Sequence, residues 1–510
     1  MIKKKKKKST SKSKTKPRIL VVTPEITYLP NGMGNMANFL TAKGGGLADV
    51  SATLVSNLFK QGVDVHVALP HYRKMFHIDV GNFISEKLRI YKSKLPEERI
   101  HLAEDRAFYY RDQVYDGYED GNISVSLVFQ REVINNIIPR VRPDLIHCND
   151  WMTGLIPAMA RRLNIPCLFT VHNIHTLKVT MECIENTGLD VAEFWQHLFF
   201  ERIPSNYEES RCFNAVDLLT SGLFAAHYIN TVSPTFLKEV VNGQHKFING
   251  NVKREFINKS KTGYASGVLN SPDPSYNPAK DEALARNYNS RNHEQGKLAN
   301  KRQLQERLGL IRDDNAPLFF WPSRLDPVQK GCQLLTDILY HVISKYWKNN
   351  LQLVVVANGS YQNHFHDVVR WHDFYKRVSV CDFDEQLSRL AYAASDFLLM
   401  PSLFEPCGLP QMICPLYGTI PIAHDTGGIH DTVSPLTVEK DSGNGFLFKH
   451  YNSKSLSWAI DQAMVFYKLP AATKKKQISR IMRESAAQFN CSVTAKHYMN
   501  IYEELLAKPM

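Results

Sequence analysis

The chain has 510 residues, of which 44% are hydrophobic and 22% are charged, as in an ordinary globular protein of two or more domains. The formal net charge is +12, but residues 1–18 hold nine Lys, one Arg and no acid, which leaves +2 (12 − 10) for the remainder. A body so close to neutral lacks the basic footprint of a nucleic-acid-binding protein. The sequence contains no run of about 18 apolar residues, which argues against a membrane-spanning helix.

Residues 1–17 form a basic tail with almost nothing apolar to bury, and we expect this tail to be disordered. It is interpreted either as a solvated segment or as a contact for nucleic acid, anionic lipid or an anionic partner. The tail lacks the apolar core of a signal peptide. The nine Cys are scattered, odd in number and without a CxxC pair, which favours reduced thiols over disulfides or a zinc site. These features predict a cytoplasmic protein.

The first βα unit contains a glycine-rich entrance to a helix. The expected elements are strands at 19–22 and 63–69 and a helix at 47–60. An unusually long connection, 26–42, follows Thr23-Pro24-Glu25 and leads to Lys43-Gly44-Gly45-Gly46, where the helix begins. This arrangement is the outline of a phosphate site, although three Gly in a row are equally typical of a flexible turn.

The following βα units place polar residues at strand ends. The expected elements are a strand at 123–128, a helix at 132–141, a strand at 144–148, a helix at 152–163, a strand at 166–171, a helix at 217–226 and a strand at 229–232. Asp150 and His172 each follow a strand, and the carboxyl ends of parallel strands share one edge of a sheet. We therefore expect both side chains at one crevice, although a lone His in such a place is usually only structural.

The second half of the sequence repeats the same alternation. The hydrophobic pattern weakens over 241–262, where we place the domain boundary. Strands are then expected at 317–321, 351–357, 378–381, 397–400 and 445–448, and helices at 301–308, 332–345, 385–394, 453–467, 474–488 and 493–506. The predicted fold is α/β, with two Rossmann-like, doubly wound domains, 18–245 and 262–485, facing a cleft. The C-terminal segment 486–510 is expected to cross back and pack on the first domain.

Residues 401–432 are the most informative stretch of the sequence. A loop after the strand at 397–400 carries Glu405, and Gly408 and Leu409 then open a short helix. A strand at 419–423 leads to the loop Thr426-Gly427-Gly428. Such loops at strand ends suit an anion, because helix N-termini and Gly amides offer N–H donors. A packing turn rich in Gly and Pro is the simpler alternative.

Polar groups gather at the predicted strand ends of both halves. They are Lys43, Asp49, Asp150 and His172 in the first half, and Asn270, Arg324, Lys330, Glu405 and the loop at Thr426 in the second. Cations beside Gly-rich helix entrances suggest a diphosphate ligand. Few acids cluster as a Mg²⁺ site would need, so we expect no metal. Glu405 has no second carboxylate nearby in the sequence, which argues against the acid pair of a glycoside hydrolase.

Eight motifs in order make the chain resemble the family of bacterial glycogen synthases and plant starch synthases, over almost its whole length after the tail. They are KGGGLADV at 43–50, HCNDWMTGL at 147–155, TVHN at 170–173, TVSP at 231–234, SGVLNSPD at 266–273, SRL at 323–325 with QKG at 329–331, FEPCGLPQ at 404–411, and TGGIHDTV at 426–433. Each match alone would be weak, but their common order is specific.

The resemblance implies a GT-B fold and a retaining glucosyltransferase that extends an α-1,4-glucan, such as glycogen, from ADP-glucose. No cofactor or metal is implied, and neither nucleic acid nor a membrane is an expected partner. The implied catalytic residues are His172, Glu405, Arg324, Lys330 and Asp150. The implied donor and phosphate contacts are Lys43, Gly45, Gly46, Asn270, Cys407, Gly408, Leu409, Thr426, Gly427 and Gly428, and Asp49 is implied to hold sugar hydroxyls. Arg324 and Lys330 would stabilise the leaving diphosphate, where negative charge grows.

The sequence departs from the family pattern in several places. About ten extra residues, 31–41, lengthen the first loop, and one extra residue separates Arg324 from Lys330. Leu403, Pro410 and the pair His424-Asp425 replace residues that are basic or polar in the family. These changes thin the positive charge around the donor, so the donor nucleotide stays open. A transferase using a UDP- or GDP-sugar, and a catalytically impaired glucan-binding homologue, are the alternatives.

Overall fold

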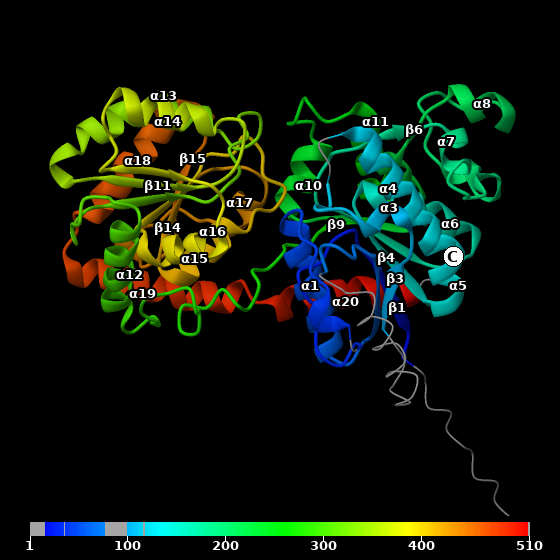
Figure 1. Ribbon diagram of the computed structural model, residues 1–510, viewed down its shortest axis with the longest axis horizontal. Coiled ribbons are helices and arrows are strands. Elements are labelled where there is room, and N and C mark those ends of the chain that lie inside the picture. Colours follow the sequence, from blue (N-terminus) through cyan, green and yellow to red (C-terminus); the bar gives the residue numbers. More distant parts are fainter. Residues whose placement is uncertain (1–15, 35, 77–98, 116–117, 508–510) are drawn as a thin grey trace, which may run out of the picture.

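The computed structural model describes residues 16–34, 36–76, 99–115 and 118–507, and it contains two parallel sheets, each flanked by helices (Figure 1). The first sheet has the order β3-β2-β1-β4-β5-β8-β9. Its strands are β1 (Arg18–Val22), β2 (Asp64–Pro70), β3 (Ile100–Ala103), β4 (Leu145–Asn149), β5 (Cys167–Val171), β8 (Tyr228–Thr231) and β9 (Ala265–Gly267). Every residue of β4 and β5 is buried, as expected for central strands of a parallel sheet covered on both faces.

The second sheet has the order β12-β11-β10-β13-β14-β15, also entirely parallel. Its strands are β10 (Leu318–Trp321), β11 (Gln352–Val356), β12 (Val378–Cys381), β13 (Phe397–Met400), β14 (Ile420–His424) and β15 (Phe446–Phe448). A small antiparallel pair, β6 (Lys178–Val179) and β7 (Val216–Asp217), lies outside both sheets. Two parallel α/β domains confirm the predicted fold class.

The helices follow the strands in the alternation that the sequence predicts. In the first domain they are α1 (Gly46–Lys60), α3 (Arg106–Tyr109), α4 (Glu119–Glu132), α5 (Ile138–Val141), α6 (Ile156–Arg162), α7 (Met181–Glu185), α8 (Tyr207–Phe213), α9 (Leu218–Ala225), α10 (Pro234–Val241) and α11 (Gly250–Lys261). The later ones are α12 (His293–Arg307), α13 (Cys332–Lys345), α14 (Gln362–Trp371), α15 (Glu385–Ala394), α16 (Pro410–Ile413), α17 (Gly427–Thr432), α18 (Ser453–Tyr467), α19 (Ala471–Gln488) and α20 (Cys491–Ala507).

The strand predicted at 123–128 is wrong, because this segment belongs to helix α4. Its alternating apolar and Ser residues imitate the period of a half-exposed strand. In the structure Ser124 is exposed, but Ser126 and Gln130 are buried: Ser126 Oγ donates to the Met152 carbonyl oxygen at 3.4 Å, and Gln130 Oε1 accepts from the Leu155 amide at 2.6 Å. One of the two Ser residues in the alternation therefore satisfies buried backbone and does not face solvent as a half-exposed strand would require. The strands of the first sheet that the sequence did not reveal are β3 and β9.

The first sheet continues further along the chain than the predicted boundary. Helix α11 lies within 241–262, and β9 pairs with β8 as an edge strand of the first sheet. The polar residues that weaken the pattern there, such as Lys259 and Lys261, belong to a helix with a single buried stripe at Val252, Glu255 and Phe256. Because most of this helix is exposed, it has too few apolar residues for a helical periodicity to be recognised in the sequence.

The last helix returns to the first domain, as Figure 1 shows in red. Tyr502 Oη lies 2.8 Å from His147 Nδ1 on β4, and Asn230 on β8 donates to Tyr498 Oη at 3.2 Å. Ala495, Tyr498 and Tyr502 belong to the same hydrophobic core as the first sheet. Helix α19 packs beside Tyr417 on the second domain, so the pair α19–α20 spans both domains.

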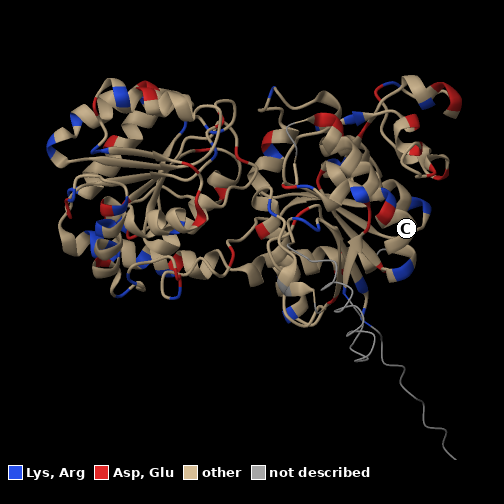
Figure 2. Ribbon diagram, in the orientation of Figure 1, with Lys and Arg blue, Asp and Glu red and all other residues tan. Residues whose placement is uncertain are grey.

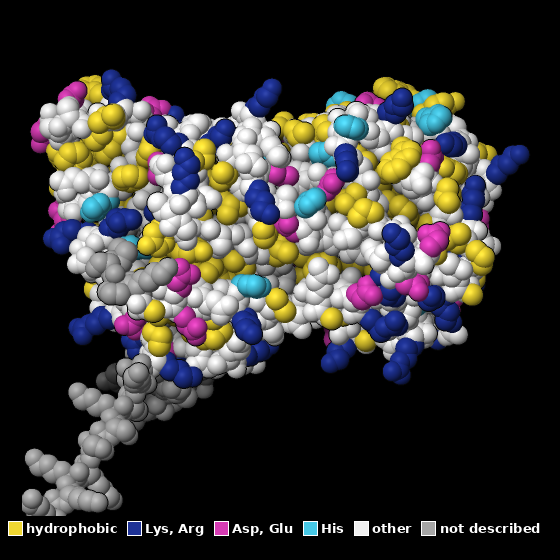
Figure 3. Space-filling view, turned by 180° about the vertical axis from the view of Figure 1, so that it is seen from behind, with side chains coloured by type: hydrophobic (Ala, Val, Ile, Leu, Met, Phe, Trp, Pro, Cys, Tyr) yellow, Lys and Arg dark blue, Asp and Glu magenta, His cyan; other side chains and the backbone are white. Residues whose placement is uncertain are grey.

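Charges of both signs are interspersed over the two domains (Figure 2), and the face seen in Figure 3 shows the same mixture. This distribution agrees with the near-neutral charge of the chain beyond residue 18. All nine Cys are free thiols, as predicted. Among the described residues, none of the helices combines the length and apolar character needed to cross a bilayer. The basic tail lies almost entirely outside the described residues.

Candidate active site

Loops from the carboxyl ends of both sheets meet where the two domains touch. Lys43 Nζ, in the loop before α1, lies 3.9 Å from Glu385 Oε2 at the start of α15. A Cβ built on Gly46 would lie 3.7 Å from Leu409 Cδ1 of the second domain. The strand-end loops that the sequence singles out therefore form one interdomain site, as expected for open parallel sheets.

Lys330 and Glu405 form a buried ion pair at the centre of the second domain's edge. Lys330 Nζ lies 2.7 Å from Glu405 Oε2, and the two side chains are only 12% and 7% exposed. Ser402 Oγ donates to the same carboxylate oxygen at 3.1 Å. The ammonium and the hydroxyl fix the carboxylate in place and compensate its charge where little water can do so.

The extra residue between Arg324 and Lys330 is absorbed by a turn around Asp326. The Asp326 side chain accepts from the amides of Val328 and Gln329, and its carbonyl accepts from the Lys330 amide at 2.9 Å. Lys330 thereby still reaches Glu405. Arg324 is exposed, and within the described part of the chain it makes no hydrogen bond or ion pair.

Asp150 and His172 are brought together at the first domain's edge, as the sequence predicts. Asp150 follows β4 with a positive φ of 57°, a conformation that costs a non-glycine residue energy. Its Oδ1 accepts from the backbone amides of His172 at 2.6 Å and Asn173 at 3.3 Å. The strained residue thus holds the loop after β5 in one orientation.

Burial favours the uncharged forms of Asp150 and His172. It raises the pKa of Asp150 to about 7, although the two backbone amides oppose that shift. It lowers the pKa of His172 to about 3, so this imidazole is neutral near pH 7. His172 Nε2 lies 3.0 Å from Asn149 Oδ1, which can only accept, so the proton of the neutral ring lies on Nε2.

The glycine-rich loop before α1 is organised by Glu25, which the sequence analysis did not select. Glu25 Oε2 accepts from the amides of Gly44 at 2.5 Å and Gly45 at 2.8 Å, and Tyr115 Oη donates to Oε1 at 3.1 Å. Burial raises the pKa of Glu25. A Cβ on Gly44 would lie 2.6 Å from the Tyr115 ring, so this position requires glycine.

Lys43 and Asp49 flank this loop and contact each other. Lys43 Nζ lies 2.9 Å from Asp49 Oδ2, and Thr27 Oγ1 donates to Asp49 Oδ1 at 2.6 Å. Both carboxylate oxygens of Asp49 therefore contact residues of the connection between β1 and α1. Gly46 is the first residue of α1, next to Gly45 as N-cap.

Thr426, Gly427 and Gly428 form the start of helix α17 and not an open loop. The Gly427 amide donates to Glu239 Oε1 at 2.9 Å, and Thr426 Oγ1 donates to the same carboxylate at 3.3 Å. Glu239 belongs to α10 of the first domain. The Gly428 amide donates to the Glu405 carbonyl at 2.9 Å, which connects α17 directly to the Lys330–Glu405 pair.

A carboxylate of the second domain makes the corresponding contact to the first domain. Asp431 of α17 accepts from Ser233 Oγ at 2.5 Å, from the Thr235 amide at 3.1 Å and from Thr235 Oγ1 at 2.6 Å. Each of the helices α10 and α17 thus receives a carboxylate of the other helix at its N-terminus, where N–H groups have no helical partner. We call this exchange the α10–α17 clasp.

The remaining predicted donor contacts lie beside Glu405. Cys407 is buried, and burial raises the pKa of its thiol to about 12. Asn270 is buried as well, and its Oδ1 has no hydrogen-bond partner among the described residues. Gly408 has a φ of 76°, and Leu409 precedes the short helix α16, whose first residue, Pro410, has no N–H to offer.

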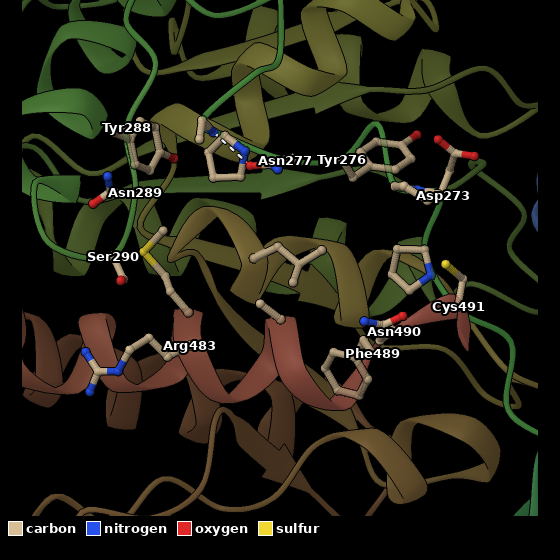
Figure 4. A pocket seen from close by; sticks show the side chains of 17 residues that line it. Asp273, Tyr276, Asn277, Tyr288, Asn289, Ser290, Arg483, Phe489, Asn490 and Cys491 are labelled. Carbon is tan, nitrogen blue, oxygen red and sulfur yellow. Dashed lines mark hydrogen bonds between the residues drawn. The ribbon is translucent and has the colours of Figure 1, made fainter. Parts of the chain in front are cut away.

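Neither of two other features suggests an alternative centre. A cavity of about 410 Å³ lies at the connection between the domains, with Arg483 and Ser290 toward one end and Asp273 at the other (Figure 4). Its lining includes none of the predicted catalytic residues. Over the described ranges, no group of three or more His, Cys, Asp or Glu side chains is arranged to hold a metal ion.

Two facing Rossmann-like domains with a buried Lys–Glu pair and glycine-rich loops at their interface define a glycosyltransferase of the GT-B class. Family models agree: residues 18–251 match "Starch synthase catalytic domain" and residues 316–464 match "Glycosyl transferases group 1". The glycogen synthase of Clostridium botulinum (strain Eklund 17B / Type B) is 31% identical over 494 residues, covering 91% of this chain and 96% of that protein. The chain belongs to the glycogen and starch synthase family.

Further comparisons support this membership. The glycogen synthase of Geobacillus thermodenitrificans is 30% identical over 502 residues and covers 92% of this chain and 96% of its own. The catalytic domain of starch synthase IV from Arabidopsis thaliana, bound to ADP and acarbose, superposes with a TM-score of 0.76 at 24% identity. That alignment covers 97% of this chain and all of the plant domain, and it confirms the fold.

Proposed function

We propose that this chain transfers glucose from ADP-glucose to the non-reducing end of an α-1,4-glucan with retention of configuration, and releases ADP. The buried Lys330–Glu405 pair carries the proposal, because it places a cation and a lone carboxylate together at the interdomain site. The structure of the plant starch synthase IV domain was determined with ADP and acarbose bound, which supports a nucleotide and a glucan as the ligand classes.

In the proposed reaction the bond from the glucose C1 to the diphosphate breaks as the acceptor oxygen bonds to C1 from the same face. The acceptor's proton passes to the departing diphosphate oxygen, so no enzyme nucleophile is needed. Lys330, together with Arg324 and Lys43, compensates the charge that grows on the diphosphate. Lys330 is bonded to Glu405 in this structure, so the donor would share or take over that ammonium. No metal is required for this balance.

His172 and Asp150 act through position in this proposal. The neutral imidazole is a poor proton donor, whereas the His172 carbonyl can face the positive charge that develops at C1. Asp150 orients that carbonyl because it binds the two successive amides at 172 and 173. Glu405 supports the same positive charge or binds sugar hydroxyls. Asp49 is proposed to hold donor or acceptor hydroxyls.

The glycine-rich loops and their neighbours are proposed to hold the donor. The assigned residues are Gly45, Gly46, Asn270, Cys407, Gly408, Leu409, Thr426, Gly427 and Gly428. The unpartnered oxygen of Asn270 is suited to a sugar hydroxyl, because a buried acceptor without a donor is costly. The carboxylates of Glu25 and Glu239 already bond to loop amides, so a diphosphate must share these donors or displace the carboxylates.

A different donor nucleotide is the second candidate, on the basis of His424. Its Nδ1 lies 2.7 Å from the Ser402 carbonyl oxygen, and burial lowers its pKa. The family's basic pair is thus replaced by a group that favours the neutral form, beside Asp425. A donor pocket with less positive charge is compatible with a UDP- or GDP-sugar.

Incubation of the purified chain with ADP-, UDP- and GDP-glucose, each with glycogen, tests both candidates. We expect radiolabelled glucose to enter glycogen fastest from ADP-glucose, and digestion of the product to show α-1,4 linkages. Faster transfer from another glucose donor would replace ADP as the assigned nucleotide. Absence of transfer from all three donors would refute the glucan synthase proposal. The proposed setting is the cytoplasm, without a membrane or nucleic-acid partner.

A further inference from the structure

A second cavity, of about 440 Å³, lies at the opposite edge of the first sheet from the active site. It is lined by residues of α6, α9, α11 and α20, and by His227 and Tyr228 at the start of β8 (Figure 1 locates α6, α11 and α20). His172 follows the carboxyl end of β5, whereas this cavity lies near its amino end. Five strand residues separate the two sites by about 16 Å.

The wall of this cavity holds a buried donor that lacks an acceptor. His227 is 5% exposed, and its Nδ1 accepts from the Cys167 amide at 2.8 Å. Since Nδ1 is the acceptor, the proton of the neutral ring lies on Nε2. No hydrogen-bond partner exists for Nε2 among the described residues. A buried N–H donor without an acceptor is unfavourable and is rare without a ligand or an ordered water molecule.

Two cations lie beside this imidazole. Arg161 Nε donates to the Ala225 carbonyl oxygen at 2.5 Å, and Lys259 donates to the Ala226 carbonyl oxygen. Burial and the proximity of Arg161 lower the pKa of Lys259 to about 8. Burial also lowers the pKa of His227 to about 4, and both cations contribute to that shift. Arg161 and Lys259 thus lie close together against carbonyl oxygens and keep N–H donors to spare, while the carboxylates of Glu255 and Glu504 also line the cavity and offset their charge.

The rest of the lining is suited to a polyhydroxylated molecule. Glu255 is buried, and its Oε1 accepts from Asn258 Nδ2 at 3.2 Å, so that both groups can bond to hydroxyls. Phe224 and Tyr264 are 41% and 40% exposed, and aromatic rings of this kind offer an apolar face for a sugar ring. The volume lies within the usual range for a small-molecule site.

We propose that this cavity binds a sugar monophosphate. The phosphate would accept hydrogen bonds from Arg161, Lys259 and the Nε2–H of His227, and the sugar would lie between the aromatic rings and the Glu255–Asn258 pair. Arg and Lys are the side chains most suited to a phosphate, and a phosphate oxygen would satisfy the orphaned imidazole N–H. The site is separate from the glucosyl transfer chemistry and does not depend on it.

Isothermal titration of glucose 1-phosphate into the full chain, with ADP present in saturating amounts, tests the proposal. Saturating ADP directs the measurement away from the active site, and we expect binding to persist. Lys259→Met and Arg161→Gln should each weaken binding at least tenfold. The matched control Lys261→Met removes an exposed cation from the same helix and should leave affinity unchanged. Thermal unfolding without ligand verifies that each variant is folded.

Inorganic phosphate and glucose, tested separately, show which parts of the ligand the cavity recognises. Glucose 1-phosphate should bind at least tenfold more tightly than either inorganic phosphate or glucose. Affinity that is unchanged in both Lys259→Met and Arg161→Gln would overturn the site, as would binding that ADP abolishes. Equal affinity for inorganic phosphate would overturn the assignment of the sugar. A weakened affinity in either folded variant, with Lys261→Met unaffected, supports the site even if no glucosyl transfer is ever detected.

Discussion

The two domains hold polar groups at the active site in opposite ways. At the first domain's edge, burial favours the neutral forms of Asp150 and His172, and their hydrogen bonds set the position of a loop. At the second domain's edge, Lys330 and Glu405 lie just as deep but face each other as an ion pair. In the proposed function the first edge maintains geometry, whereas the second supplies the positive charge for a leaving diphosphate.

The largest expected effect comes from removing one charge of the second edge. Lys330→Ala and Glu405→Ala should each lower kcat by about 10²-fold or more, the typical cost of losing one preorganised electrostatic contact. Initial rates of glucose transfer to glycogen measure this loss. The control is Lys345→Ala, which breaks an exposed pair with Asp461 at 2.8 Å and should change kcat less than twofold. Near-normal turnover in both folded site variants would show that the site is assigned wrongly.

The second prediction concerns the pH dependence of the first edge. Burial raises the pKa of Asp150 to about 7 from its ordinary value of 3.8, so the native state binds its proton more tightly than the unfolded state. The resulting stabilisation is complete below the unfolded pKa and disappears as the pH rises through 7. Relative to Asp150→Asn, the free energy of unfolding should fall by about 2–3 kcal/mol between pH 5 and pH 8. Urea unfolding at both values measures it, and parallel pH profiles would contradict the assignment.

The α10–α17 clasp connects the two edges, and breaking it should have a smaller effect. Asp431→Ala removes the acceptor for Ser233 and Thr235, and it should lower the free energy of unfolding by about 1–2 kcal/mol, as other lost helix caps do. Denaturant unfolding measures the change. The control Asp112→Ala removes a carboxylate that is 74% exposed and should cost less than about 0.5 kcal/mol. Equal losses in both variants would mean that the clasp contributes nothing specific.

The smallest expected effect is that of the basic tail. Deletion of residues 1–16 should leave glucosyl transfer unchanged, because every residue assigned to the site lies beyond position 16. Initial rates of glucosyl transfer by the shortened and the full chain, measured under the same conditions, test this expectation. RNA binding at several salt concentrations tests a separate role for the tail. A large loss of glucosyl transfer on deletion would show that residues 1–16 contribute to the reaction in addition to the two edges.

The strand-end rule predicts much of the site from the sequence alone, because parallel strands bring their carboxyl ends to one edge. Asp150, His172 and Lys330 follow strands and lie at the interdomain site. Glu25 obeys the same rule, as it follows β1 within three residues, and could have been chosen on that basis. Nothing else in the sequence marks it, because the amides from which it accepts lie 19 and 20 residues further along the chain.

The clasp could not be predicted, because its members lie far apart in the sequence. Glu239 and Gly427 are 188 residues apart, and no local pattern relates them. Helix α4 was mistaken for a strand for a related reason: the partners of Ser126 and Gln130 lie elsewhere in the chain. Local periodicity reports which positions are polar, but only tertiary structure shows whether water or backbone satisfies them.

Helix α20 bears on how the chain is made. Its residues Tyr498 and Tyr502 complete the core around β4 and β8, although some 220 residues of the second domain and its connections are synthesised between β9 and α20. A nascent first domain would leave the ribosome with a gap in its core, next to His147 and Asn230, until α20 has been synthesised. Vectorial folding can therefore begin with the first domain, but the core of this domain is complete only after the second domain and α20 have been made.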